Sequence, residues 1–211
     1  HKCTNNFLSD WNEKARYRIK KLNSIIYSEP NMSSIPISDG VLNNRLNITK
    51  DLVDWSEVVL PDGRVGFIEK QDIELMTQDK DLRDQTSIVI SIALSMKGVP
   101  YLWGGNSVNG NDCSGFIHNI YENSGINLPR DARQQAELGK LIIPNNNWSN
   151  VKPGDLLFFG KENKITHVGM STGGKEFIHQ GGMVKVNSLD SSSNKFAPKR
   201  NETFQFIKRL N

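Results

Sequence analysis

Apolar residues in the second half of the chain recur at helical spacing in two places. Between Leu82 and Lys97 they fall almost all round the helix, the pattern of a buried helix, and Gly98-Val99-Pro100 ends it. The second stretch is 113–123, which Asn111 or Asp112 can cap at its start. One face of this amphipathic helix carries five side chains at i, i+3, i+4, i+7 and i+8: Cys113, Phe116, Ile117, Ile120 and Tyr121.

Short strands are predicted after this second helix. Asp131 and Gln134 have the spacing of a capping box, which indicates a short helix that runs to Leu138. The apolar runs that follow predict five strands: Leu156–Phe159, His167–Thr172, Glu176–Gln180, Val184–Val186 and Thr203–Lys208. Helices followed by an antiparallel meander are typical of an α+β domain.

The first half of the chain has shorter apolar runs separated by turn residues. Ile35–Ile37 and Leu46–Ile48 are short β-prone segments, and Pro61-Asp62-Gly63 predicts a turn between two further strands. About 60 residues of short strands indicate a small barrel. The polar stretch Thr77–Gln85 is the natural linker, so we expect two domains, residues 1–80 and 81–211.

Composition and charge exclude several classes of protein. The chain has 211 residues, 36% hydrophobic and 23% charged, which fits a soluble globular protein. The longest nearly apolar run, Ile88–Met96, is too short to span a bilayer. The net charge is only +3, and we interpret the basic cluster Arg16–Lys21 as a solvated face, so no nucleic-acid partner is expected. The chain starts at His1 and not at methionine, from which we expect a processed, exported protein whose signal segment is absent from this chain.

Cys113 is the candidate nucleophile. The free N–H groups and the positive end of the helix dipole at a helix start favour a thiolate, which a nearby base would help to form. His1 is terminal, and His118 lies on another side of the same helix. The remaining candidate bases are His167 and His179.

These two histidines lie on adjacent predicted strands, twelve residues apart. Their side chains share a face of the sheet only if the hairpin contains an odd number of loop residues. We therefore expect a three-residue loop, either 172–174 or 173–175. His167 could then act as the base and His179 could orient it through a ring nitrogen.

Simpler interpretations exist for each of these residues. A cysteine at a helix start is usually structural, and a histidine on a strand is usually a satisfied core or surface residue. Metal binding by Cys113, His167 and His179 is conceivable, but no acidic ligand stands at a motif spacing beside them.

Six ordered sequence blocks resemble the NlpC-type cell-wall cysteine peptidases, a compact papain-like fold. The resemblance covers roughly residues 82–210. The blocks are YLWGG (101–105), NDCSGF (111–116), LPR (128–130), PGDLLFF (153–159), THVGM (166–170) and FIHQ (177–180). Two departures are small: Gln180 replaces a commonly small residue, and the second helix carries His118.

The resemblance implies roles for individual residues. Cys113 would be the nucleophile, His167 the general base and acid, and His179 the orienting third residue. Tyr101 would line the site and help to stabilise the oxyanion together with the Cys113 backbone N–H. Asp112 and Ser114 would contact the substrate peptide, and no metal or cofactor is required.

The first 80 residues resemble a bacterial Src-homology-3-like barrel. The residues that carry this resemblance are YSEP (27–30), DWSEV (54–58) and DGRVGFI (62–68), with Phe67 where tryptophan is more usual. A generic small β domain is the simpler interpretation. Such a barrel before an NlpC-type domain resembles the γ-D-glutamyl-L-diamino-acid endopeptidases, in which the barrel reads the free amine of an N-terminal L-Ala. Asp112 is the first candidate to bind that amine and Glu29 the second.

The resemblance implies a cysteine endopeptidase that hydrolyses the γ-D-glutamyl–diamino acid bond of peptidoglycan stem peptides or muropeptides. An amidase or acyltransferase on the same fold, or a cell-wall binding protein with an inert catalytic half, remain as alternatives. We expect a monomer. The Cys113 thiol must stay free for this chemistry, so no disulfide with Cys3 is expected.

Overall fold

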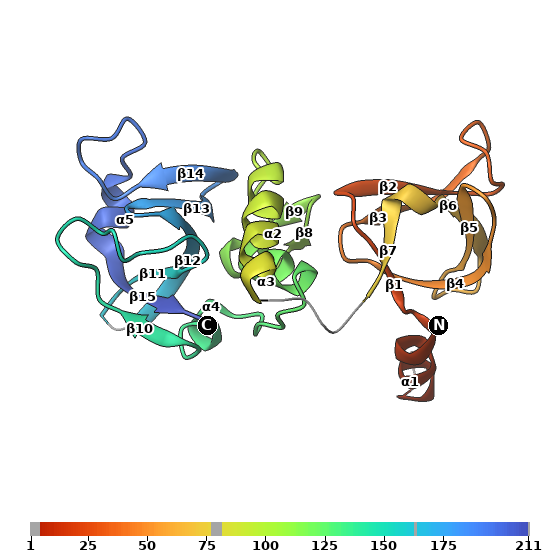
Figure 1. The fold of residues 1–211 in the computed structure, drawn as a ribbon, viewed down its shortest axis with the longest axis horizontal. Coiled ribbons are helices and arrows are strands. Elements are labelled where there is room, and N and C mark those ends of the chain that lie inside the picture. Colours follow the sequence, from red (N-terminus) through yellow and green to blue (C-terminus); the bar gives the residue numbers. More distant parts are fainter. Residues whose placement is uncertain (1–4, 77–81, 163, 211) are drawn as a thin grey trace. The chain divides into compact units, whose positions relative to one another are not determined.

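The structure is a computed structural model that describes residues 5–76, 82–162 and 164–210. The chain divides into two compact units, His1–Gln78 and Asp79–Asn211 (Figure 1). The boundary predicted between residues 80 and 81, like most of the predicted linker, lies outside the described residues.

The first unit consists of a helix, α1 (Asn5–Lys14), and a seven-stranded sheet with the order β3-β2-β6-β5-β4-β1-β7. Its strands are β1 (Tyr17–Ile19), β2 (Asn23–Tyr27), β3 (Pro36–Val41), β4 (Arg45–Asp51), β5 (Trp55–Val59), β6 (Val65–Glu69) and β7 (Ile73–Leu75), with a short 3₁₀ helix at Lys70–Asp72. The predicted turn at Pro61-Asp62-Gly63 joins β5 to β6, and Gly63 has a φ of +87° that favours glycine.

Figure 1 shows this sheet curling back on itself. The buried side chains of the core are Ile19, Ile26, Leu46, Val58, Leu60, Ile68 and Ile73. A curled all-β sheet fits the predicted barrel, and its Src-homology-3-like identity stays a prediction.

The second unit packs helices against a six-stranded antiparallel sheet, which confirms the predicted α+β class. Its helices are α2 (Leu82–Ser95), α3 (Cys113–Asn123), α4 (Ala132–Gln135) and α5 (Pro198–Thr203). The sheet contains β10 (Lys140–Ile142), β11 (Leu156–Lys161), β12 (Lys164–Gly173), β13 (Glu176–Gln180), β14 (Val184–Ser188) and β15 (Phe204–Arg209), and β8 (Asn106–Ser107) pairs with β9 (Gly110–Asn111).

The strand order of this sheet is β10-β15-β11-β12-β13-β14. Strands β11 to β14 form the predicted meander, whereas β15 returns to the opposite edge and pairs with β11. Strand β11 therefore has a neighbour on each side, and its four residues from Leu156 to Phe159 are fully buried. Helix α3 contacts β12 and β13, so the meander supports the start of that helix.

One expectation about burial is wrong. Helix α2 buries Val89 and Ala93, and Met96 just after it is also buried, but Leu94 on the helix is 42% exposed. The apolar residues of α2 thus form one buried face with partly covered flanks. Among the described helices, none is long and apolar enough to cross a membrane.

Candidate active site

A cavity of about 830 Å³ lies within the second unit. Its walls come from the loop before α3, the first turn of α3, the α4 region, β12, the segment after β13, and α5. Five of the residues singled out from the sequence line it: Tyr101, Asp112, Cys113, Ser114 and His167. The structure therefore brings the candidate nucleophile and the candidate base to one cavity.

The start of α3 follows the prediction closely. The helix begins at Cys113, and the Asp112 carboxylate caps it by accepting a hydrogen bond from the Gly115 N–H at 2.7 Å. This cap satisfies one of the free donors at the helix start and fixes the first turn. The Cys113 thiol is free, while Cys3 lies outside the described residues.

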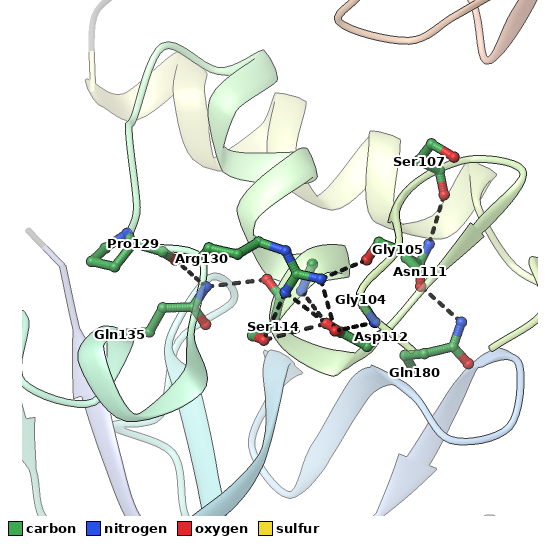
Figure 2. Close-up of polar contacts among 11 residues, drawn as sticks. Gly104, Gly105, Ser107, Asn111, Asp112, Ser114, Pro129, Arg130, Gln135 and Gln180 are labelled. Atoms are coloured by element: carbon green, nitrogen blue, oxygen red, sulfur yellow. Dashed lines mark hydrogen bonds and ion pairs between the residues drawn. The ribbon is translucent and has the colours of Figure 1, made fainter. Parts of the chain in front are cut away.

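Arg130 ties this first turn to the preceding loop, as Figure 2 shows. Its guanidinium donates to both Asp112 carboxylate oxygens, at 2.9 and 2.7 Å, and to the Gly105 carbonyl at 2.9 Å. Burial alone would raise the pKa of Asp112, but Arg130 and the N–H groups of Gly115 and Gly104 outweigh it and hold that pKa below its usual value. Each Asp112 oxygen already accepts hydrogen bonds, so a substrate amine would share these acceptors with Arg130.

His167 on β12 and His179 on β13 face the same side of the sheet. Their rings contact Phe159 and Phe177 respectively, with centroid distances of 5.6 and 4.9 Å. Gly169 lies beside them, and a Cβ at this position would stand 3.0 Å from the His179 Cβ. The glycine therefore leaves room for the His179 side chain.

The prediction of a three-residue loop in the β12–β13 hairpin is wrong. Gly173 pairs with Glu176, so only Gly174 and Lys175 form the loop. A bulge between Ser171 and Gly173 inserts one extra residue, and the shared face results from the bulge and not from the loop.

A chain of hydrogen bonds runs from His167 to Asn187 on β14. The His167 Nε2 lies 2.8 Å from the His179 Nδ1, and the His179 Nε2 lies 2.9 Å from the Asn187 Oδ1. The Asn187 amide nitrogen donates to the Lys195 carbonyl at 3.0 Å, which turns its oxygen toward His179. The sequence analysis did not identify Asn187, because only the pairing of β13 with β14 brings it to the histidines.

This chain fixes the protonation pattern of the two rings. The Asn187 oxygen can only accept, so the His179 Nε2 carries the proton. Burial is the main factor that lowers the pKa of His179 to about 4, so the ring is neutral and its Nδ1 accepts from the His167 Nε2. The unprotonated nitrogen of neutral His167 is then Nδ1.

The electrostatics of the thiol differ from the expectation. Burial raises the pKa of the Cys113 thiol, although the N–H groups of Val168 and Ser114 and the charge of Arg200 act in the opposite direction. Burial also lowers the pKa of His167 well below its usual value, with smaller effects from Arg200 and His179. These two shifts favour a neutral thiol and a neutral imidazole, so the helix start alone does not produce a thiolate.

Other residues singled out from the sequence lie around this centre. Tyr101 lines the cavity, and its backbone N–H donates to the Gly182 carbonyl. The amide of buried Gln180 donates to Asn111 at 2.7 Å (Figure 2). It also donates to the Val99 carbonyl, so it ties β13 to the segment just before Tyr101. His118 bonds the Leu128 carbonyl through Nδ1, away from Cys113 as expected.

Glu29 belongs to the first unit. It lies after β2 in a turn where its backbone N–H donates to the Ser34 hydroxyl at 3.3 Å. Its role in amine binding stays a prediction, as do the roles of the cavity residues.

Residues 98–200 match the NlpC/P60 family. This segment is an NlpC/P60 domain. It contains the whole of the cavity lining, spans α3, β12 and β13, and ends within α5.

Two curated relatives and one solved structure show how far the likeness extends. The chain is 38% identical over 116 residues to a gamma-D-glutamyl-L-lysine dipeptidyl-peptidase of Bacillus subtilis, which covers 54% of this chain and 37% of the relative. It is 30% identical over 167 residues to the protein of the same name from Bacillus cereus, and this match covers 76% of this chain and 48% of that relative. The chain thus spans less than half the length of either relative.

The fold likeness extends further along the chain. The crystal structure of an NlpC/P60 family protein from Bacillus cereus matches with a TM-score of 0.78 and 25% identity. The match covers 96% of this chain and 66% of that structure, so it includes the first unit as well as the NlpC/P60 domain.

Proposed function

We propose that this protein is a cysteine peptidase that hydrolyses the bond between the γ-carboxyl of D-Glu and a diamino acid in peptidoglycan stem peptides. The observation that carries the proposal is the cavity lined by both Cys113 and His167, with His167 bonded to His179 and His179 bonded in turn to Asn187. The names of the two curated relatives support the substrate class.

Proton transfer starts the proposed reaction. The neutral imidazole of His167 takes the thiol proton of Cys113 at Nδ1 as the sulfur attacks the γ-carbonyl of D-Glu. The Cys113 N–H and the Tyr101 hydroxyl stabilise the tetrahedral oxyanion. Protonated His167 then gives its proton to the leaving amine, and water activated by the same ring hydrolyses the thioester.

Further parts of the proposal concern the first unit and the setting of the enzyme. Asp112 is the first candidate to bind the free amine of an N-terminal L-Ala, and Glu29 of the first unit, which we propose to be a Src-homology-3-like barrel, is the second. Ser114 contacts the peptide beside the nucleophile. The protein acts outside the cytoplasm on peptidoglycan or released muropeptides, as a monomer.

The test is cleavage of L-Ala-γ-D-Glu-L-Lys and of the meso-diaminopimelate tripeptide, followed by mass analysis of the products. The wild-type protein should release L-Ala-γ-D-Glu, and Cys113→Ala should release none while keeping its melting temperature. His118→Gln is the matched control, since His118 lies on α3 but bonds the Leu128 carbonyl. Full activity of Cys113→Ala, or no cleavage by the wild type, contradicts the proposal.

A further inference from the structure

Arg200 is a cationic side chain of the cavity to which no role has been assigned above. It lies on α5 and lines the cavity together with Cys113 and His167. Its guanidinium carbon is 5.8 Å from the centroid of the Phe159 ring, and that ring is 5.6 Å from the His167 ring. Phe159 and His167 are directly paired on neighbouring strands, so Arg200 lies on the His167 side of the cavity.

The guanidinium of Arg200 has no hydrogen bond or ion pair to any residue that the structure describes. The two other arginines of the cavity wall do have acidic partners. Arg130 donates to the Asp112 carboxylate, and the Arg133 Nε lies 3.4 Å from the Asp131 Oδ1. Arg200 is half-buried and rests against an aromatic ring. Its planar set of N–H donors is therefore held in place and available to a ligand.

The charges of the cavity wall favour an anionic ligand at this end. Four cationic side chains line the cavity against two carboxylates. Both carboxylates, Asp112 and Asp131, already have arginine partners. The excess positive charge thus belongs to Arg200 and to the exposed Lys164 at the start of β12.

The proposed reaction indicates which anionic group of the substrate would lie beside Arg200. His167 gives its proton to the leaving amine, so the leaving amino acid lies next to His167. The carbon that bears this amine also bears the α-carboxyl group, which is ionised when the diamino acid is the last residue of the peptide. We propose that Arg200 binds this carboxylate and so makes the enzyme selective for stem peptides that end at the diamino acid; this inference rests on the proposed function.

The test compares three peptides: L-Ala-γ-D-Glu-L-Lys with a free carboxylate, the same peptide as its C-terminal amide, and the peptide extended by D-Ala. The wild-type kcat/KM should be higher for the free acid than for the amide by about 10- to 100-fold, the range of a charge-assisted pair of hydrogen bonds. The D-Ala peptide should resemble the amide.

The variant Arg200→Leu should lose the preference. Its ratio of kcat/KM for the free acid to kcat/KM for the amide should fall to about 1, and this ratio cancels any common effect that loss of the Arg200 charge has on Cys113 and His167. Arg200→Lys should keep part of the preference, since lysine retains the positive charge but lacks the planar pair of N–H donors of the guanidinium. Lys199→Leu is the matched control: it removes the same charge from the same helix at an exposed position outside the cavity lining, and should keep the wild-type ratio.

Each outcome has a distinct meaning. A wild-type enzyme that cleaves the acid and the amide equally well overturns the inference and leaves the proposed function intact. If Arg200→Leu lowers kcat/KM equally for all three peptides and keeps the melting temperature of the wild type, Arg200 has a general effect on the Cys113 thiol. This result also overturns the inference. Arg200→Gln provides a second variant if Arg200→Leu does not fold. A wild type that cleaves none of the peptides overturns the proposed function, and the inference with it.

Discussion

The side-chain amide of Asn187 is separated from His167 by one imidazole, yet its orientation decides which nitrogen of His167 is free. Because the Lys195 carbonyl holds the amide nitrogen, the amide oxygen faces His179. The sequence analysis expected His179 to orient His167 but contained no signal for Asn187, which looks like an ordinary polar strand residue. A partner two strands away becomes visible only with the register of β13 and β14.

We predict that Asn187→Leu lowers kcat about 10-fold with little change in KM, an effect typical of outer hydrogen-bond partners. Without its acceptor, His179 can carry its proton on Nδ1, which would place the His167 proton on Nδ1 and remove the base. Nitrogen NMR of the ring nitrogens in the Cys113→Ala background reports this tautomer directly.

The matched control for this prediction is Asn187→Asp. It keeps an acceptor beside the His179 Nε2 and should retain the wild-type tautomer. Unchanged kcat and unchanged ring-nitrogen signals in Asn187→Leu would contradict the assignment of Asn187 as a positioning residue.

The pH dependence of kcat/KM follows from the same residues. The active form needs a neutral His167, whose pKa burial and the charge of Arg200 hold well below the usual histidine value, and a thiol whose pKa burial raises. We predict that the acid limb of the profile lies below the usual histidine pKa and that the alkaline limb lies above the usual thiol pKa. The profile is measured with the free-acid tripeptide. An acid limb at or above the usual histidine pKa would contradict the assignment of a neutral thiol and a neutral imidazole to Cys113 and His167.

At the scale of elements, α3 is the part that the sequence predicts best. The periodicity of its apolar face and the cap at Asp112 define both of its ends, and the structure has the same bounds. Helix α5 and strand β10 were not predicted, because six and three residues are too few to show a period. Arg200 is on α5, so the cavity wall that α5 forms was missed together with the helix.

Close packing of α3 against the loop before it leads to a stability prediction. A Cβ at Gly115 would lie 2.1 Å from the Gly105 carbonyl oxygen and 3.0 Å from the Arg130 guanidinium. Gly115→Ala should therefore force the loop away from the helix and destabilise the NlpC/P60 domain by about 1–3 kcal/mol. Urea unfolding measures this change.

A matched alanine substitution separates overpacking from an effect of alanine itself. Ser91→Ala, at an exposed position on α2, should leave the free energy of unfolding nearly unchanged. A Gly115→Ala variant with the stability and activity of the wild type would show that the loop and Arg130 are not held as tightly as the packing indicates.

At the scale of the whole molecule, the sequence predicts the division into an all-β part and an α+β part from its short apolar runs and turns, its helical periodicity and the polar stretch between them. The structure has two units of these two kinds. The return of β15 to pair with β11 was beyond sequence reasoning, since strand order depends on contacts between residues far apart in the chain. The site shows the same limit: Cys113, His167 and His179 were predicted from the blocks that contain them, whereas Asn187 and Arg200 lie outside those blocks, and Arg130 lies in a block to which no role was assigned.

The bulge in the β12–β13 hairpin has a consequence for how this segment can change during evolution. Loss or gain of a single amino acid between the two histidines would rotate one imidazole to the far side of the sheet, whereas loss or gain of a pair would preserve their meeting. Viable length changes in this hairpin should therefore come in even numbers, and a one-codon deletion here should be as harmful to turnover as replacing His179 itself.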